Sequence, residues 1–252
     1  MPKISACVIC FNEEDRIEDC LKSLRSVADE IVVVDSGSTD RTREIATVLA
    51  DRLIDQSFLG YLEQKNFAVA QASNDWILSL DSDERVSPEL AKSILAAKGH
   101  LEERVAWSFN RRTYYLYRWL NYTWYPDAKV RLFDRRRCHW GGVNPHDRVM
   151  VSGGETGHLA GDLHHYSFRS LSDHLNKLNK FTDIAAAELV KSGRRVSAVS
   201  PILHGGWAFV RRYILKRGFL DGFAGLTVAV SALLYGFAKY GKAYLAGLNA
   251  KR

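Results

Sequence analysis

Along the first hundred residues, short apolar runs alternate with segments in which apolar residues recur every three or four positions. The continuous runs, rich in valine and isoleucine, predict strands at residues 4–11, 31–34, 52–54 and 76–80. The periodic segments predict helices that contain residues 17–24, 45–49, 62–72 and 88–94. Strands and helices that alternate at this spacing indicate an α/β fold, with a mixed, mainly parallel sheet and helices on both of its faces.

Polar residues at the ends of the apolar runs fit the starts of these helices. Asn12 follows the first strand and is expected to cap the helix after it, and Ser38 or Thr39 is expected to cap the next one. Ser87 precedes Pro88, which is the arrangement of a capping side chain followed by proline in the first helical turn. A fourth helix is therefore expected to begin at residue 88.

The pattern changes after residue 104. Residues 105–119 are aromatic and roughly alternating, which predicts an antiparallel strand or hairpin, whereas residues 120–168 are rich in Trp, Gly, Pro and His and show little periodicity. The apolar spacing from Leu171 to Leu189 predicts a long amphipathic helix that ends at Gly193. We therefore divide the chain into a first domain, residues 1–168, and a helical extension, residues 169–252.

The extension carries the basic character of the chain. Its last part, residues 200–252, has eight lysines and arginines and one acid, whereas residues 1–199 have 27 bases and 28 acids. The formal net charge of +6 therefore belongs to a basic and apolar tail. Such a tail favours an anionic membrane surface as a partner, and it argues against a nucleic acid, which needs basic residues spread over a reading face.

Three arrangements of this tail are compatible with its sequence. Residues 207–217 alternate apolar and basic groups, which favours an amphipathic helix lying in the membrane interface. Residues 222–238 form an uncharged run of 17, short of the roughly 20 that a spanning helix needs. A buried pair of helices at a homo-oligomer contact and a true membrane span are the alternatives to interfacial attachment.

The four cysteines indicate a reducing compartment. Cys7 and Cys10 lie three positions apart in the first expected strand, so their side chains point to opposite faces and cannot share a disulfide or a metal. They are expected to be small core residues, and nothing in the sequence suggests an oxidised framework. The first residues, Met-Pro-Lys followed by a strand pattern, do not resemble a signal peptide. A cytoplasmic location is therefore expected.

Acidic residues gather where the strands of the sheet end. Parallel sheets bind their ligands beyond the carboxyl ends of their strands. Residues 11–14 read Phe-Asn-Glu-Glu and lack the glycine-rich loop of dinucleotide enzymes, so a dehydrogenase is disfavoured. Asp35 ends the second strand, and Asp81 and Asp83 end the fourth. The pair Asp81 and Asp83 is suited to hold Mg²⁺ or Mn²⁺ on phosphate oxygens, and we expect all three carboxylates to converge around one cation-bridged diphosphate at the edge of the sheet.

Three segments carry a resemblance to a known family. Together, VICFNEE at residues 8–14, VVDSGSTD at 33–40 and LDSDE at 80–84 resemble the family 2 glycosyltransferases of the GT-A fold. The resemblance covers residues 3–170 and extends more weakly to the rest, where the chain is similar to the lipopolysaccharide core glucosyltransferase branch. It implies a GT-A catalytic domain over residues 1–168, with a nucleotide-binding half at 1–100 and an acceptor-side half at 101–168.

The resemblance also implies a nucleotide-sugar site made of these residues: Phe11, Asn12, Asp35, Gly37, Lys65, Asp81 and Arg131. By this correspondence an aromatic ring stacks on uracil, an acid accepts a hydrogen bond from the base, a second acid lies on the ribose or sugar side, and an arginine lies near the pyrophosphate. Lys65 stands where the family more often has arginine. The alternatives are a core position for Phe11, a turn cap for Asp35, and surface positions for Lys65 and Arg131.

The remaining chemistry is assigned in the same way. The resemblance implies that Asp83, with His165, binds a divalent metal (Mn²⁺ or Mg²⁺), and a purely structural histidine is the alternative. Asp147 corresponds to the carboxylate that acts as base, although the branch more often has glutamate there. Asp127 and Asp134 are competing candidates for the base.

The expected protein is an inverting hexosyltransferase on the inner face of the cytoplasmic membrane. It would use a UDP-sugar donor and a lipid-linked or lipopolysaccharide core glycan acceptor, with glucose as the sugar suggested by the resemblance. A nucleotidyltransferase and a non-catalytic, membrane-associated binding module are the alternatives. The first usually has a glycine-rich and basic loop that this chain lacks after its first strand, and the complete acidic set argues against the second.

Overall fold

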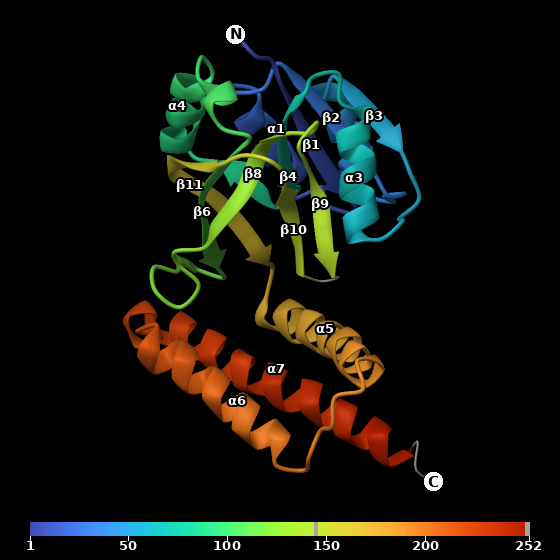
Figure 1. Ribbon diagram of the computed structural model, residues 1–252, viewed down its shortest axis with the longest axis vertical. Helices are drawn as coiled ribbons and strands as arrows, with labels where there is room; N and C mark the ends of the chain where they lie inside the picture. Colours follow the sequence, from blue (N-terminus) through green and yellow to red (C-terminus); the bar gives the residue numbers. More distant parts are fainter. Residues whose placement is uncertain (144–145, 250–252) are drawn as a thin grey trace. The chain divides into compact units, whose positions relative to one another are not determined.

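The structure, a computed structural model, describes residues 1–143 and 146–249 of the chain. It is made of two compact units, whose helices and strands are labelled in Figure 1. The first unit comprises Met1–Arg112 and Asp127–His165, and the second comprises Thr113–Pro126 and Tyr166–Arg252. Each unit has its own core and is described separately.

The first unit is built on a mixed sheet with the strand order β3-β2-β1-β4-β8-β6-β11-β5. Its parallel part is made of β3 (Arg52–Asp55), β2 (Glu30–Asp35), β1 (Ile4–Cys10) and β4 (Trp76–Asp81). Next to β4 the pairing becomes antiparallel, and this part contains β8 (Ala128–Asp134), β6 (Ala106–Tyr115), β11 (Thr156–Phe168) and β5 (Glu84–Val86). The α/β fold predicted from the alternating pattern is confirmed.

Helices cover both faces of the parallel strands. One face packs against α1 (Ile17–Leu24), α2 (Thr42–Leu49) and α4 (Pro88–Ala97), and the other packs against α3 (Tyr61–Gln71). The short 3₁₀ helix Leu101–Glu103 follows α4. Strands that are buried on both faces must be apolar at every position, which explains the unbroken apolar runs. Ala6 and Val8 of β1 face the first cluster, whereas Cys7 faces the second.

The same alternation separates the cysteines as expected. Cys10 lies in the α1 side of the core and Cys7 in the α3 side, and all four cysteines are free and buried. Burial raises the pKa of the Cys7 thiol to about 12. These cysteines are core residues.

The helix starts are only partly as predicted. Ser87 Oγ accepts a hydrogen bond from Leu90 N at 3.1 Å, and Pro88 is the first residue of α4, as expected. The prediction that Asn12 caps the first helix is wrong, because α1 begins at Ile17 and the Asn12 side chain accepts from Thr39 N at 2.9 Å. Asn12 has a φ of +53°, a conformation that asparagine tolerates better than most residues. It therefore joins the loops that follow β1 and β2.

The cap of α2 also differs from the prediction. Neither Ser38 nor Thr39 bonds the first turn; instead Asp40 Oδ1 accepts from Thr42 N at 3.0 Å at the start of α2. Ser38 Oγ accepts from Asn12 N at 2.9 Å. Both hydroxyl-bearing residues are therefore used in the loop, where short side chains compete for backbone groups.

Residues 120–168, which show little periodicity in the sequence, contain strands. Besides β8 and most of β11, β9 (Cys138–Val143) and β10 (His146–Val151) pair as an antiparallel two-stranded sheet. The sequence conceals them because charged residues such as Arg131 are buried within these strands, so that hydrophobic alternation is lost. Asn66 of α3 fixes β9 through both atoms of its amide, since Nδ2 donates to Trp140 O at 2.9 Å and Oδ1 accepts from Trp140 N at 3.0 Å.

The second unit is mainly helical. The ends of β6 and β11 belong to it, and β7 (Arg118–Trp119) pairs with β6 as the predicted hairpin. The predicted amphipathic helix is α5 (Leu171–Lys191), and Gly193 follows it with a φ of +69°. Then come α6 (Ser200–Val210), a π-helical turn (Arg211–Leu215), a 3₁₀ turn (Gly218–Asp221) and α7 (Gly222–Asn249).

The two units differ in one respect from the two contiguous parts, 1–168 and 169–252, that were expected. The change of unit at His165/Tyr166 is close to the expected boundary after residue 168, but residues 113–126 belong to the second unit. The buried carboxylate of Asp221 explains this, because it accepts hydrogen bonds from the backbone N–H groups of Asn121, Tyr122 and Thr123 at 2.8–3.1 Å. Tyr115 and Leu120 also pack against α7.

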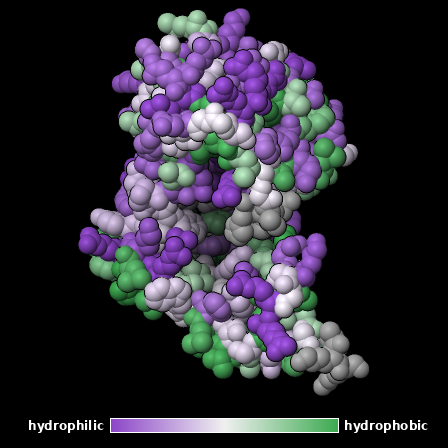
Figure 2. Space-filling model, in the orientation of Figure 1, coloured by the Kyte–Doolittle hydropathy of each residue, from purple (hydrophilic) through white to green (hydrophobic). Residues whose placement is uncertain are grey.

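The second unit exposes many large apolar side chains. Among the described residues, one helical stretch, Gly218–Leu248, is long and apolar enough to cross a membrane by length and composition, with a mean hydropathy of 1.5. Hydrophobic residues are visible beside hydrophilic ones on the face of this unit that is shown in Figure 2. We call the following exposed residues the apolar surface: Ile202, Leu203, Trp207, Ile214, Leu215, Phe219, Leu220, Phe223, Phe237 and Leu245.

Candidate active site

Two of the predicted site residues, Asp35 and Asp81, end strands β2 and β4 at the carboxyl edge of the parallel part of the sheet. Asp35 is paired with Cys10 across β2 and β1, and Asp81 is paired with Ile9 across β4 and β1. Paired residues point to the same face of a sheet and consecutive residues to opposite faces. Asp35 and Asp81 therefore flank the end of β1 at one edge, as expected, but their carboxylates emerge on opposite faces.

Asp35 organises the turn that follows β2. Its Oδ2 accepts from Gly37 N at 2.9 Å and Ser38 N at 2.8 Å, and its Oδ1 accepts from Ser38 Oγ at 2.5 Å. Gly37 has a φ of +88°, which a residue with a side chain rarely adopts. The turn-capping interpretation of Asp35 is therefore correct for this structure, and a hydrogen bond to a base stays a prediction. Arg43 Nη1 lies 3.4 Å from Asp35 Oδ2 on the open side of the turn.

Lys65 connects two acidic residues on the α3 side of the sheet. Its Nζ lies 2.7 Å from Asp147 Oδ2 on β10 and 3.1 Å from Asp81 Oδ1 at the end of β4. The lysine side chain is buried, so the alternative of a solvated helix residue is wrong. Its ammonium also lies 4.3 Å from the centre of the Trp140 ring, within the range of a cation–π contact.

Arg131 continues this row of charges. Its Nη2 lies 3.0 Å from Asp81 Oδ2 and 2.8 Å from Glu84 Oε1, and its guanidinium carbon lies over the Trp140 ring, 5.1 Å from the ring centre. The arginine is buried, which excludes the surface alternative. Glu84 is fully buried, and its Oε2 accepts from Asp81 N at 3.0 Å. The row Asp147, Lys65, Asp81, Arg131, Glu84 thus alternates in charge, and we call it the charge row.

The charge row keeps Asp81 ionised. Burial by itself would raise the pKa of Asp81, but the charges of Lys65 and Arg131 outweigh that effect and hold the pKa well below its ordinary value. A carboxylate in this position is an acceptor for hydroxyl and amide donors at every physiological pH. Because Asp81 lies in the row and Asp147 ends it, a ligand that contacts one of them lies close to the cation that both share.

Asp83 lies apart from the row. Its Oδ2 is 3.5 Å from His165 Nε2 on β11 and 3.9 Å from Arg16 Nη1. Burial would raise its pKa, but His165 and Arg16 lower it overall. Among the described residues, no group of three or more His, Cys, Asp or Glu side chains is close enough to hold a metal ion. The two expected metal ligands, Asp83 and His165, are close to each other.

Phe11 and Asn12 lie in the loop at the end of β1. Phe11 is 55% exposed, so the alternative of a core residue is wrong and its ring is free to meet a ligand. Asn12 is held by Ser38 and Thr39, as described above, which fixes the loop that carries Phe11.

Geometry distinguishes the three candidate bases. Asp134 is paired with Trp76, the first residue of β4, and therefore lies at the edge of the sheet opposite to Asp81. Asp127 is bound by Arg111 at 3.0 Å and by Lys129. Only Asp147 of the three contacts the charge row directly, among the residues that the structure describes.

Three residues of the site were not singled out from the sequence. Glu84 follows Asp83 directly, and its role could have been suspected because a short strand begins there, between two acids and a buried valine. Trp140 lies in the aperiodic region, where no pattern reveals that its ring borders Lys65 and Arg131. Arg16, which is buried beside Asp83, stands in a polar run and gave no signal.

Comparisons with known proteins show the family to which this chain is similar. A family model described as glycosyl transferase family 2 matches residues 5–175. A glycosyltransferase of Rickettsia typhi is 31% identical over 95% of this chain and 85% of its own length. A lipopolysaccharide core biosynthesis glycosyltransferase of Rhizobium meliloti is 30% identical over 97% of this chain and 93% of its own length.

Among solved structures, glucosyl-3-phosphoglycerate synthase of Mycobacterium tuberculosis, in complex with Mn²⁺, UDP and glucosyl-3-phosphoglycerate, overlaps with part of the chain. The TM-score is 0.38 and the identity 24%, over 45% of this chain and 44% of that chain. Nothing about the ligands of this chain follows from so partial an overlap.

Proposed function

Because this chain belongs to glycosyl transferase family 2, we propose that it transfers a hexose from a UDP-sugar to a hydroxyl group of a lipid-linked or lipopolysaccharide core glycan, with inversion at the anomeric carbon. It is a glycosyltransferase, and the nucleotidyltransferase and the non-catalytic module are set aside. The observation that carries the proposal is the charge row, which joins the proposed base to a donor-side acid through one lysine.

On the donor side, Phe11 is proposed to stack on uracil, and its exposure supports this role. Asp81 accepts a hydroxyl of the ribose or of the sugar, because its carboxylate stays ionised at the sheet edge. Arg131 stabilises negative charge that develops on the leaving diphosphate. Asp35, Asn12 and Gly37 are proposed to shape the loop against which the uracil ring of the donor lies.

Asp83 and His165 are proposed to hold a divalent cation. A carboxylate oxygen and an imidazole nitrogen 3.5 Å apart suit Mn²⁺ or Mg²⁺ when diphosphate oxygens and water complete the coordination, since such ions need only one or two carboxylates from the protein. When bound, the cation would neutralise charge on the diphosphate. Arg16, which lies beside Asp83, orients that carboxylate.

On the acceptor side, Asp147 is proposed as the general base. It would take the proton from the acceptor hydroxyl while the hydroxyl oxygen attacks the sugar and the bond to the diphosphate breaks. Lys65 holds the carboxylate in place before the acceptor arrives. The contact of Asp147 with the charge row, beside Asp81, supports this assignment over Asp127 and Asp134.

The acceptor class and the location are proposed from the second unit and from a relative. The relative in Rhizobium meliloti is named for lipopolysaccharide core biosynthesis. The apolar surface, with basic residues in the same helices, supports peripheral attachment to the cytoplasmic face of an anionic membrane. Contact between two copies through these helices is the competing proposal, and glucose is the proposed sugar.

The test is a transfer assay with purified protein, Mn²⁺, a panel of UDP-hexoses and a truncated lipopolysaccharide core acceptor. We expect release of UDP that depends on the acceptor and on one hexose, and a product whose anomeric configuration, read by NMR, is opposite to that of the donor. A product with retained configuration would reject the single displacement. Nucleotide transfer to the acceptor would reject the proposed reaction altogether.

A further inference from the structure

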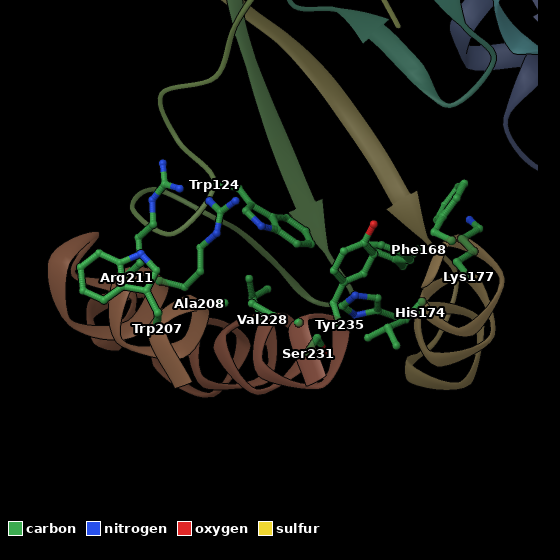
Figure 3. Close-up of a pocket in the computed structure, with 15 residues that line it drawn as sticks. Trp124, Phe168, His174, Lys177, Trp207, Ala208, Arg211, Val228, Ser231 and Tyr235 are labelled. Atoms are coloured by element: carbon green, nitrogen blue, oxygen red, sulfur yellow. The ribbon is translucent and has the colours of Figure 1, made fainter. Parts of the chain in front are cut away.

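A cavity of about 360 Å³ opens in the second unit between α5, α6 and α7. Its size falls within the range of small-molecule pockets, roughly 300 to 1,000 Å³. The charge row and the proposed metal ligands are not among its lining residues. Figure 3 shows the side chains that surround it, and its aromatic walls are formed by Trp124, Phe168, Phe181, Trp207 and Tyr235.

The helices α6 and α7 pack closely at one end of the cavity. A Cβ atom on Gly236 would lie only 2.9 Å from Gly205 Cα, so the two helices touch through their backbones at this point. Next to this contact, Ala208 and Ser231 line the cavity with small side chains.

The cavity combines apolar walls with positive charge. Lys177, Arg211 and Arg212 line it, and no acidic side chain is among the lining residues of the described chain. Arg212 Nη1 donates to Thr123 O at 2.8 Å, and Lys177 is 3.1 Å from Asp173. Arg211 is exposed, so its guanidinium can turn toward a ligand. Burial lowers the pKa of the lining His174 to about 4, so this imidazole is neutral near pH 7.

We propose that this cavity binds a single anionic phospholipid, with one hydrocarbon chain between the aromatic walls and the phosphate at Arg211 and Arg212. A free phosphate would make no use of the aromatic walls, and a neutral sugar would make no use of the positive charge of the arginines. Trp207 belongs both to the cavity and to the apolar surface, so a chain can enter from a bilayer on which that surface lies.

This proposal is separate from adsorption to a membrane and from sugar transfer. Adsorption uses the whole apolar surface and any number of lipids, whereas the cavity selects one lipid by its charge and its chain. The donor and acceptor sites are assigned to residues of the first unit, so loss of transfer activity and loss of lipid binding are independent results.

The full chain is titrated with dihexanoylphosphatidylglycerol below its micellar concentration, and binding is followed by calorimetry and by tryptophan fluorescence, to which the lining residues Trp124 and Trp207 contribute. We expect saturable binding of one lipid per chain. Dihexanoylphosphatidylcholine should bind about tenfold more weakly, because it lacks net negative charge for the arginines. Inorganic phosphate should not compete. Equal binding of the two lipids, or competition by phosphate alone, would overturn the proposal.

Two matched pairs of variants locate the site. Ala208→Phe fills the cavity and should weaken binding of dihexanoylphosphatidylglycerol about tenfold or more, whereas Ala246→Phe, at an exposed position of α7, should leave it unchanged. Arg211→Gln should weaken it about tenfold, and Arg194→Gln, at an exposed position outside the cavity, should not.

The folded state of each variant is checked by its UDP affinity and by its circular dichroism spectrum. If Ala208→Phe does not fold, Ser231→Val, which adds less volume to the same cavity, replaces it. Parental lipid affinity in a folded cavity-filling variant would show that the lipid binds elsewhere and would reject the site.

Discussion

The ammonium of Lys65 lies 2.7 Å from the carboxylate of Asp147, which follows it by 82 positions in the sequence. The same nitrogen lies 3.1 Å from Asp81. One cation therefore serves the proposed base and a proposed donor-side acid at once. This arrangement makes the two halves of the catalytic domain depend on each other, because a change on either side alters the charge that the other side meets.

Replacing Asp147 by Asn tests the base. General-base catalysis typically contributes about 10²- to 10⁴-fold to a rate, so turnover should fall by that order while the UDP affinity stays nearly unchanged. Steady-state kinetics and calorimetry with UDP and Mn²⁺ measure the two quantities. Asp127→Asn is the control, since Asp127 is bound by Arg111 outside the contact with Lys65. Parental turnover in Asp147→Asn, or a comparable loss in the control, would contradict the assignment.

Replacing Lys65 by Met should destabilise the fold. It leaves the carboxylates of Asp81 and Asp147 near each other without their shared cation, and removal of one partner from a buried ion pair costs about 3 kcal/mol. Urea unfolding measures the free energy of unfolding. Lys92→Met, at an exposed position of α4, is the matched control and should change it little. An unfolding free energy equal to the parent's would mean that the ion pairs contribute nothing net.

Asp83→Asn and His165→Ala test the proposed metal ligands. Each variant should reduce the UDP affinity measured with Mn²⁺ by about tenfold or more, because a charge-assisted contact is lost. The UDP affinity measured with EDTA should change little. His164→Ala is the control, because consecutive residues of β11 point to opposite faces of the strand. If Mn²⁺ strengthens UDP binding equally in the parent and in both variants, other groups hold the ion.

His174 makes the stability of the second unit depend on pH. Burial lowers its pKa from 6.5 to about 4 in the folded protein, and its ring is stacked on Phe168 at 4.1 Å and bonded to the Tyr115 hydroxyl at 2.7 Å. Between pH 6.5 and 4 the unfolded chain therefore binds a proton that the folded chain does not. Stability rises with pH in this window and is lost as the pH falls through it.

The size of this effect follows from the shift. One pKa unit corresponds to about 1.4 kcal/mol. The unfolding free energy of the parent falls between pH 7 and pH 4.5, and in His174→Gln this fall should be smaller by about 1 to 3 kcal/mol. Urea unfolding at the two pH values measures it. His100→Gln is the control, since His100 is exposed beside Glu103. An unaltered pH dependence in His174→Gln would show that this histidine is not the proton acceptor.

The proposed membrane attachment through the apolar surface can be tested by introducing one charged residue. Leu203 is 66% exposed on α6, and Leu203→Asp should reduce co-sedimentation with vesicles containing phosphatidylglycerol about tenfold, because an ionised carboxylate is costly to bring into a bilayer interface. Val48→Asp, at a position of α2 that is 81% exposed, should have no effect. If the parent sediments as a dimer that Leu203→Asp dissociates, and vesicles bind neither protein, self-association replaces membrane attachment.

Much of the first unit could be predicted from its sequence, because strands buried on both faces are apolar at every position. The acids at their ends could be found for the same reason, since Asp35 and Asp81 stand directly after such runs. The strands between residues 128 and 168 could not. Arg131 is paired with Asp81 and His165 with Asp83, acids that are far away in the sequence, and no local pattern reveals such pairing.

The partners of the site residues were equally hidden. That Lys65 meets Asp147 depends on how β9 and β10 pack against α3, which is tertiary information. That Asp35 and Asp81 emerge on opposite faces depends on a register difference of one residue between two strand pairs. The sequence predicts that Asp35 and Asp81 lie at the same edge of the sheet. The register of the strand pairs determines the face of the sheet on which each carboxylate emerges.

The hydrogen bonds from residues 121–123 to Asp221 bear on how this protein can be cut or recombined. The helical unit is formed by two stretches of chain that are hydrogen-bonded to each other. One of them, residues 113–126, lies in the sequence between two segments of the first unit. Removal of everything after residue 168 would leave an orphaned hairpin with its apolar side uncovered. A chimera in which the C-terminal part of the second unit is exchanged between relatives will fold well only if residues 113–126 are exchanged together with it.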